Sequence, residues 1–376
     1  MDSKSRMLKS WNFEEPDRVP LEIYLYPAAR NLPGADKILE FQENEADNFR
    51  GVHGFDWGFM GLDSQYAEEV IEDVPGAFKR VLRTHSTTAG KFTAVTKHYC
   101  DEGDPNDFHW EKRFIETIDD FKRVAEADRP RRTFDLGKYN QGCVEAGNRG
   151  LPCTGLFHPL GELVRTSNMD EVYMWLMTED RIVMEYLERC TEQVCDTLLS
   201  IKDKELADSP VFMTYALEML TPPWLGREHF NKLVFPFDKR VNDAVHAIGG
   251  RHRAHCHGNS GEFLELFADM GVDAVEPLEP PPYGNNILAK AKKQVGKRML
   301  LSGNVISQEF PLDSFKIKDV RELVKQAIAE GAPGGGFTLK TTGGAVGVGK
   351  TKEQCIKDID CNLALIDAWR EFGSYN

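Results

Sequence analysis

Two histidines separated by one residue are the strongest candidates for chemistry in this sequence. His255 and His257 lie in the segment Arg253-Ala254-His255-Cys256-His257-Gly258-Asn259. Successive side chains of an extended strand point to opposite faces, so the two imidazoles project together while Cys256 projects the other way. Two imidazoles on one face can chelate a metal ion. A pair of hydrogen-bonded core histidines is the competing interpretation.

A third ligand is available on the next predicted strand. The segment Asp273-Ala274-Val275-Glu276-Pro277-Leu278-Glu279 follows a short helical pattern and carries carboxylates at a comparable position. Glu276 is preferred over Glu279 because Glu276 lies within the predicted strand and Glu279 beyond it. Catalytic metal sites commonly combine histidine and glutamate with one open position. We therefore predict a divalent metal held by His255, His257 and Glu276.

The elements that must position these residues alternate regularly along the chain. Helical patterns such as 169–207, 227–248 and 352–372 separate eight predicted strands. This alternation predicts a parallel sheet, and eight units in one chain favour an α/β fold of the (β/α)8 TIM barrel type over a doubly wound sheet. Active sites of such barrels lie at the carboxyl ends of the strands. The predicted strands are 21–26, 55–63, 151–157, 211–216, the strand that ends in the histidine pair, 274–278, 299–303 and 336–340.

Three further acidic residues lie in or just after predicted strands. Glu22 is the one charge in the first strand, Asp63 ends the second, and Glu218 follows the fourth. Carboxylates at these places could orient a substrate as catalytic residues, with surface or capping roles as the alternative.

One stretch departs from the alternation. Residues 68–107 are rich in β-formers separated by turn residues, and a helix is predicted near 119–127. We interpret the chain as one barrel domain, residues 1–376, with a hairpin and helical excursion from about 64 to 150 that partly covers the barrel mouth.

The composition of the chain limits the classes of partner that we expect it to bind. The chain has 376 residues, 41% of them hydrophobic, and a formal net charge of −14. No basic surplus exists to offset phosphate, which argues against nucleic acid or an anionic membrane as main partner and for a small-molecule substrate. No leader pattern and no apolar run near the roughly 20 residues of a membrane span are evident, so a cytoplasmic location is expected. The eight cysteines are scattered without a CxxC pair, as reduced thiols are.

A phosphate-binding pattern occurs near the end of the chain. The segment 344–351 satisfies G-x-x-x-x-G-K-[ST] between a predicted strand and a predicted helix. Only one helix and a short tail follow it, whereas a P-loop enzyme needs a further acidic strand for magnesium. Nucleotide hydrolysis is therefore disfavoured. Cradling of an anionic group by backbone N–H donors fits a barrel better.

With these residues in place, the chain resembles the uroporphyrinogen decarboxylase superfamily over nearly its whole length. That superfamily also contains the zinc-dependent methylcobamide:thiol (coenzyme M type) methyltransferases. Residues 26–33 look like the decarboxylase motif R-Q-A-G-R-Y-L-P, with Tyr26 in place of the first arginine, and 56–63 is similar to the segment that ends in an essential aspartate. Thr342-Gly343 stands where the decarboxylases have H-G.

On the methyltransferase side, residues 255–259 look like the zinc segment H-x-C-G-N, with His257 in place of the cysteine. Thr342 occupies the approximate position of the second zinc-binding cysteine. The resemblance implies a zinc ion that holds a thiol acceptor as thiolate, and a methylated corrinoid as co-substrate on a separate carrier protein docked at the barrel mouth. It also implies cofactor-binding roles for Asn259, Thr342 and Gly343.

The resemblance thus favours a methyltransferase that moves a methyl group between a corrinoid and a small, metal-activated acceptor. Two alternatives remain open at this stage. One is a uroporphyrinogen decarboxylase-type carboxy-lyase of tetrapyrrole metabolism, and the other is a non-catalytic ligand-binding barrel.

Overall fold

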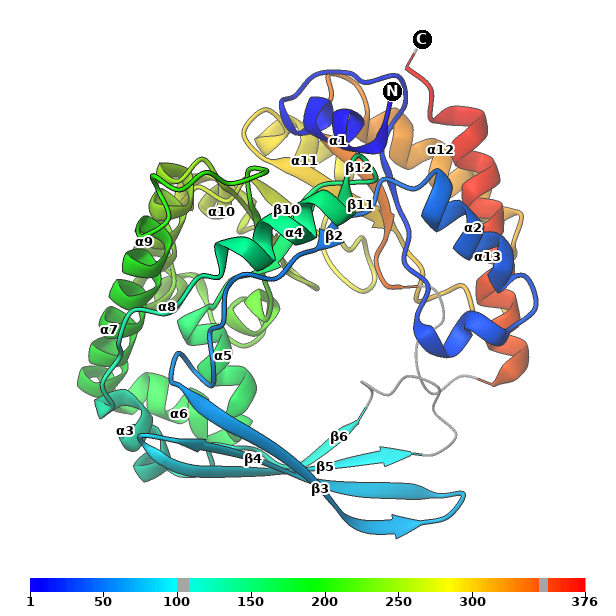
Figure 1. Cartoon of the computed structure of the whole chain (residues 1–376). Coiled ribbons are helices and arrows are strands. Elements are labelled where there is room, and N and C mark those ends of the chain that lie inside the picture. The colour runs from blue at the N-terminus through cyan, green and yellow to red at the C-terminus, as the bar shows by residue number, and fades with distance from the viewer. Residues whose placement is uncertain (100–107, 345–350, 376) are drawn as a thin grey trace.

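The computed structural model describes residues 1–99, 108–344 and 351–375. In this part of the chain, eight parallel strands form one curved sheet in the order β1-β12-β11-β10-β9-β8-β7-β2 (Figure 1). Helices cover its outer side, so the predicted (β/α)8 architecture is confirmed. The strands are β1 (Leu21–Glu22), β2 (Arg50–Gly51), β7 (Pro152–Gly155), β8 (Val211–Thr214), β9 (Arg251–His255), β10 (Ala274–Glu276), β11 (Leu300–Val305) and β12 (Phe337–Thr341).

The helices bury one apolar stripe each against the sheet or a neighbouring helix. In the long helix α7, for example, Val183, Leu187 and Val194 are fully buried. No helix in the described ranges has both the length and the apolar character that a membrane crossing needs. The helices are α1 (Ser3–Trp11), α2 (Ala35–Asn44), α3 (Ile118–Glu126), α4 (Leu136–Ala146), α5 (Pro159–Thr166), α6 (Met169–Thr178), α7 (Asp180–Leu199), α8 (Arg227–Leu233), α9 (Phe235–Ala247), α10 (Leu264–Met270), α11 (Leu288–Val295), α12 (Asp319–Gly331) and α13 (Lys352–Phe372), with 3-10 turns η1 (Pro27–Asn31) and η2 (Leu217–Leu220).

Side chains close the barrel between β1 and β2, where no backbone ladder joins the strands. The side chain of Asn48 accepts a hydrogen bond from Ile23 N (2.9 Å) and donates one to Ile23 O (2.7 Å). Asp47 N donates to Leu21 O (2.8 Å), and the Asp47 carboxylate accepts from Leu21 N (3.2 Å). Asp47 and Asn48 therefore satisfy the β1 backbone groups that a paired strand would otherwise satisfy.

Helix α1 fills the amino-terminal end of the barrel. Ser10 Oγ donates a hydrogen bond to Phe337 O at the start of β12 (2.8 Å). Met7 and Trp11 pack in one buried cluster with residues at the beginnings of β8 and β10 and just before β7, including Val211, Ala274 and Leu151. Because α1 plugs this end, a ligand would enter the barrel from its carboxyl end.

A four-stranded antiparallel sheet lies beyond the barrel end opposite α1 (Figure 1). Its strands are β3 (Ser64–Val74), β4 (Phe78–Thr87), β5 (Gly90–Tyr99) and β6 (His109–Lys112), in that order. Phe92 and Ala94 on β5 are buried, and Phe59 packs on the ring of Phe92 (centroids 5.4 Å apart). Strand β3 is exposed along almost its whole length.

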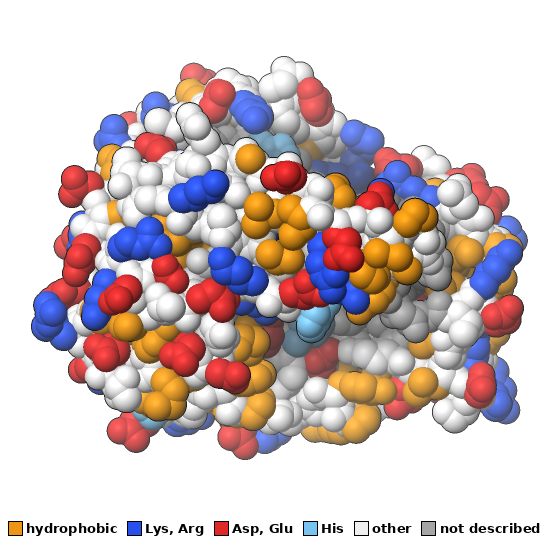
Figure 2. Space-filling view, turned by 90° about the horizontal axis from the view of Figure 1, so that it is seen from below, with side chains coloured by type: hydrophobic (Ala, Val, Ile, Leu, Met, Phe, Trp, Pro, Cys, Tyr) orange, Lys and Arg blue, Asp and Glu red, His pale blue; other side chains and the backbone are white. Residues whose placement is uncertain are grey.

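The face of the molecule on the side of this sheet mixes both signs of charge. Figure 2 shows acidic and basic side chains interspersed there, with hydrophobic side chains gathered near the middle. This face therefore presents no continuous basic surface among its described residues.

The predicted second strand is wrong. Residues 55–63 form a turning loop, and the second barrel strand is β2 at Arg50–Gly51. Gly58, Met60 and Gly61 have φ of 61°, 50° and 82°, which no strand tolerates, and Phe59 and Leu62 close a turn through reciprocal backbone hydrogen bonds of 2.9 Å. The aromatic side chains of this loop pack on one another and on neighbouring elements, as Phe55 does on Trp57 and Phe59 does on Phe92.

Two other expectations change in detail. The helical pattern at 169–207 is two helices, α6 and α7, which meet at Glu179. Met174 on α6 and Leu199 at the end of α7 are exposed. Of the phosphate-binding pattern at 344–351, residues 345–350 lie outside the described residues, and Thr351 is the N-cap of α13, where its Oγ1 accepts a hydrogen bond from Gln354 N (3.2 Å).

Candidate active site at the carboxyl end of the barrel

A cavity of about 710 Å³ opens at the carboxyl ends of the barrel strands. Most of its strand residues are two positions apart, as the alternation of side chains along a strand requires. Arg253, His255 and His257 follow this rule on and just after β9, as do Lys340 and Thr342 at β12. The cavity is lined by Tyr24, Tyr26, Phe49, Gly51, Val52, His53, Phe55, Trp57, Cys153, Thr154, Gly155, Met213, Tyr215, Arg253, His255, His257, Glu276, Pro277, Lys340, Thr342, Gly343 and Gly344.

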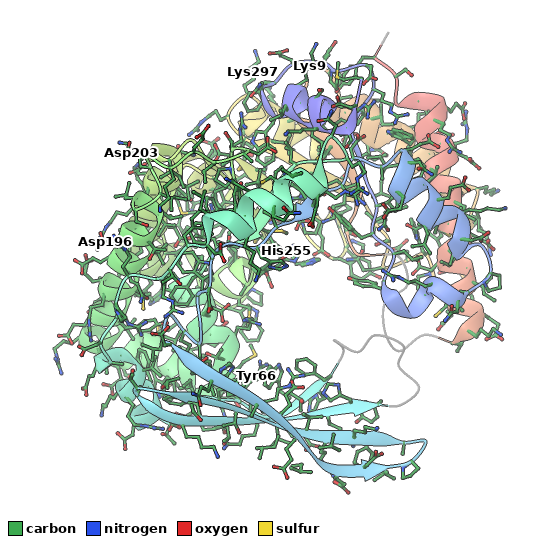
Figure 3. The ribbon with its side chains drawn as sticks, viewed as in Figure 1. Lys9, Tyr66, Asp196, Asp203, His255 and Lys297 are labelled. Carbon is green, nitrogen blue, oxygen red and sulfur yellow. The ribbon has the colours of Figure 1, made fainter. Side chains whose placement is uncertain are left out.

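The two histidines lie on one face, as the strand alternation predicts. The ring centroids of His255 and His257 are 4.6 Å apart, with the ring planes at 76°. Cys256 points away and is fully buried beside Thr221, with Sγ 3.9 Å from Thr221 Oγ1. Figure 3 shows His255 on the side of the barrel that faces the antiparallel sheet, where Tyr66 lies across the intervening space.

Each histidine is held by its own carboxylate. His255 Nδ1 is 2.6 Å from Glu276 Oε1, and His257 Nδ1 is 2.8 Å from Glu279 Oε1. A carboxylate accepts hydrogen bonds, so each Nδ1 carries the proton in these pairs. Each Nε2 then remains as the nitrogen available to a ligand in the cavity.

Glu276 belongs to a buried chain of charges. Its Oε2 forms an ion pair with Lys340 Nζ and lies 3.5 Å from the guanidinium of Arg253. Arg253 also binds Glu22 Oε2 (2.7 Å), and Glu22 Oε1 accepts hydrogen bonds from Ser302 and Thr338 (both 2.8 Å). Burial alone would raise the pKa of Glu276, but the charges of Lys340, Arg253 and His255 hold it well below its usual range.

The pair His257–Glu279 shows the same competition between burial and the interactions with charged neighbours. Burial lowers the pKa of His257, but the hydrogen bond and charge of Glu279 outweigh it, so the pKa of His257 is raised. Burial raises the pKa of Glu279, and the bonds from His257, Gly258 N (2.6 Å) and Gln308 Nε2 (2.5 Å) overcome this and lower it. Glu279 is therefore a carboxylate that orients both His257 and the turn at Gly258.

Carboxylates outnumber the permanent cations around the histidines. Glu22, Glu276 and Glu279 are three carboxylates, whereas Arg253 and Lys340 are two cations. The surplus negative charge favours a cation at the histidines, either a proton or a metal ion.

The three predicted metal ligands lie close together, but Glu276 hydrogen-bonds to His255 instead of sharing a metal position with it. Glu276 contacts His255 through Nδ1, and both of its oxygens are engaged by cationic or proton-donating groups. In the described part of the chain, no group of three or more His, Cys, Asp or Glu side chains is arranged to hold a metal ion. The arrangement provides two imidazoles whose outer nitrogens are fixed by carboxylates, a pattern usual for metal-binding histidines.

The other predicted residues divide between the cavity and its surroundings. Thr342 and Gly343 line the cavity, and Thr342 Oγ1 donates to Gln308 Oε1 (2.5 Å). Glu22 lies beneath the cavity as the partner of Arg253. Asn259 is exposed and does not line it.

Glu218 and Asp63 lie outside the cavity lining. Glu218 is in the turn η2, and its charge contributes to the raised pKa of His257. Its Oε2 is buried and has no hydrogen-bond partner among the described residues. Asp63 is largely exposed and forms an ion pair with Arg132 (2.5 Å) at the start of the antiparallel sheet, so the structure does not bring it to the histidines.

Several cavity residues were missed from the sequence. Arg253 and Lys340 precede His255 and Thr342 by two positions, and this spacing could have placed them on the inner face. His53 and Trp57 were hidden by the wrong assignment of the second strand.

A known protein family matches just over half of the chain. The profile of the family described as uroporphyrinogen decarboxylase (URO-D) matches residues 153–344, which are 192 of the 376 residues. No curated protein matches the sequence significantly.

Among solved structures, a methyltransferase from Methanosarcina mazei superposes with a TM-score of 0.58 at 14% identity, over 99% of each chain. A sugar phosphate isomerase/epimerase from Parabacteroides distasonis superposes with a TM-score of 0.32 at 14% identity, over 63% of this chain and 78% of its own chain. A Bacteroidetes-affiliated GH5 cellulase superposes with a TM-score of 0.34 at 11% identity, over 65% of this chain and 77% of the cellulase chain. At such identities the likeness to the methyltransferase shows a shared fold.

Proposed function

The chain belongs to the uroporphyrinogen decarboxylase (URO-D) family, and on this basis we propose that it is a methyltransferase that moves a methyl group between a corrinoid and a small molecule held at His255 and His257. The observation that carries the proposal is the pair of imidazoles at the carboxyl end of the barrel, each fixed at Nδ1 by a buried carboxylate. The corrinoid is inferred from the resemblance of residues 255–259 to the H-x-C-G-N segment.

The histidine pair fits a divalent metal such as zinc. The two Nε2 atoms would hold the ion, and the surplus of carboxylates over cations would favour its charge. Glu276 and Glu279 would act as the hydrogen-bond partners of the ligands rather than as ligands. When bound, such an ion lowers the pKa of a coordinated thiol and so supplies a thiolate nucleophile near neutral pH.

A few neighbouring residues would hold this site in the geometry and charge state that binding needs. Arg253 and Lys340 keep Glu276 ionised, so His255 Nδ1 stays protonated and its Nε2 stays free to bind. Gln308 joins Glu279 to Thr342 and so fixes the β12 side of the cavity. Glu218 in the η2 turn would act on the site through its charge, which helps to raise the pKa of His257.

The decarboxylase alternative finds less support in the cavity. A porphyrinogen carries many carboxylates, and its recognition requires unpaired cations. Here Arg253 and Lys340 are both neutralised by glutamates.

We also propose that a corrinoid carrier protein docks at the barrel mouth.

The test is to incubate the protein and zinc with methylcobalamin and a panel of thiols while following the absorbance of cob(I)alamin. We expect demethylation with at least one thiol, loss of it in His257→Ala, and retention in His246→Ala. His246 is a suitable control because it also pairs with a carboxylate, Asp273 (2.9 Å), but on the outer surface. Absence of demethylation with every thiol would contradict the proposal, and conversion of uroporphyrinogen would instead support the decarboxylase.

A further inference from the structure

We propose that the small molecule taken by this cavity is a flat, uncharged aromatic compound, whose ring lies against an aromatic wall opposite the histidines. Calling this compound the partner in methyl transfer rests on the proposed function, whereas its recognition rests on the cavity alone.

The cavity wall has two contiguous arcs of different chemistry. Strands β9, β10 and β12 contribute the charged arc, which contains Arg253, Glu276 and Lys340 beside the histidines. Strands β8, β7, β2 and β1 follow one another around the barrel and contribute the aromatic arc. The aromatic arc contains Tyr215, Trp57, Phe55, Phe49, Tyr24 and Tyr26.

The aromatic arc is fixed in position. Phe55 and Trp57 stack with centroids 5.3 Å apart and planes at 2°, and Trp57 Nε1 donates a hydrogen bond to Gly155 O (3.0 Å). Tyr24 Oη accepts a hydrogen bond from Phe49 N (3.0 Å). Rings held in this way offer faces and edges to another aromatic ring without further ordering.

Two glycines leave open space in the same wall. Gly51 on β2 and Gly155 on β7 both line the cavity, and a Cβ placed on either would meet no atom within 4 Å. Neither glycine has a positive φ, so the backbone does not require glycine there. The open space at Gly155, beside the indole of Trp57, is therefore a recess in the wall, and a ring placed in it would lie next to an aromatic side chain.

The aromatic arc offers no unpaired cation, among the described cavity residues, to an anionic substituent on the ring. Arg253 and Lys340, the cations of the cavity, are both paired with glutamates. On the aromatic arc, burial raises the pKa of the Cys153 thiol to about 12, so this side chain is neutral as well. A cavity of about 710 Å³ is within the range of small-molecule sites, roughly 300–1,000 Å³.

The experiment is calorimetric titration of the protein with methoxybenzene and with methoxycyclohexane, which differ in aromaticity and flatness. We expect methoxybenzene to bind at least tenfold more tightly, and 4-methoxybenzoate, which adds a negative charge, to bind more weakly than methoxybenzene. Equal binding of the first two compounds, or binding of neither, would overturn the proposal.

Two cavity variants test where methoxybenzene binds. Gly155→Val should fill the recess and reduce the affinity for methoxybenzene at least tenfold with little change in melting temperature, and Trp57→Leu should also reduce it. Trp224→Leu is the matched control, because Trp224 also stacks on an aromatic ring, Tyr173 (5.3 Å), but does not line the cavity. Unchanged affinity in Gly155→Val and Trp57→Leu would place the ligand elsewhere and overturn the proposal.

Binding and turnover separate the two proposals. His257→Ala should keep the affinity for methoxybenzene within a few-fold, because the aromatic arc is intact in that variant. If aromatic ligands bind in the cavity but no methyl transfer is found, the proposed function fails and this inference stands. If methyl transfer is found only with non-aromatic thiols and no aromatic ligand binds, this inference fails and the proposed function stands.

Discussion

The two arcs of the cavity are built by different means. The charged arc consists of residues within strands that backbone ladders join, as in the pairing of Glu276 with His255 across β10 and β9. The aromatic arc depends largely on residues before or after short strands, and the β1–β2 closure within it is made by side chains of Asp47 and Asn48. Arg253 connects the arcs, because its guanidinium lies over the ring of Phe49 (4.1 Å).

This difference indicates a division of roles. Buried ion pairs fix the charged arc in one geometry, as a metal or reacting group requires, at a cost in desolvation. The aromatic arc has few charges and fixed rings, and is suited to determine which molecule binds. If the roles divide in this way, changes in the charged arc should cost more stability than changes in the aromatic arc.

The largest effect is expected for Arg253→Met. This change leaves Glu22 and Glu276 buried without a shared cation, and breaking a buried ion pair costs about 3–5 kcal/mol in the free energy of unfolding. Urea denaturation measures the loss. Arg321→Met is the matched control, because Arg321 pairs with Glu371 on the exposed surface and its loss should cost far less stability. Equal losses in the two variants would remove the central role given to the charged arc.

A somewhat smaller effect is expected at low pH from His252, which is on β9 but faces away from the cavity. Burial lowers the pKa of His252 to about 4, and its Nε2 lies 2.8 Å from Thr214 Oγ1. The unfolded chain takes up the proton near pH 6.5, so stability from the neutral imidazole is present above that pH and is lost as pH falls toward 4. A shift of this size corresponds to about 3 kcal/mol.

The free energy of unfolding measured from pH 7 to pH 4 should therefore fall less steeply in His252→Gln than in the wild type. His246→Gln should not reduce this acid loss, because the hydrogen bond to Asp273 raises the pKa of His246 and its contribution is lost at high pH instead. Identical pH profiles for the wild type and His252→Gln would contradict the buried neutral imidazole.

A smaller effect is expected for Asn48→Ala in the closure of the aromatic arc. The change leaves the N–H and C=O of Ile23 without their partners, which should cost about 2 kcal/mol. Amide exchange at Ile23 should accelerate while exchange on β9 changes less. Asn140→Ala is the control, because Asn140 makes a similar pair of hydrogen bonds to Ala207 N and Glu205 O at the surface. An equal cost in both variants would show that the closure contributes no special stability.

The sequence predicted the charged arc better than the aromatic arc, for a physical reason. Strand alternation placed His255 and His257 on one face and Cys256 on the other, because period-two geometry is a local property. The partners of their Nδ1 atoms depend on the register of β9 against β10, which local spacing does not contain.

The aromatic arc was misread because the run at 55–63 has the composition of a strand, whereas its positive φ angles at Gly58, Met60 and Gly61 form a loop. The true β2 is only two residues long and has no apolar alternation to reveal it. Its closure through Asp47 and Asn48 is a tertiary interaction that no sequence pattern indicates.

The most direct test of the central claim is elemental analysis of the native protein, purified without chelators, beside His257→Ala and His246→Ala, with the melting temperature of each. We predict roughly one zinc or similar divalent ion per chain in the native protein and in His246→Ala, and loss of most of it in His257→Ala with little change in melting temperature. A metal-free native protein, together with a lower melting temperature in His257→Ala, would show that the two histidines are core residues and would contradict the account.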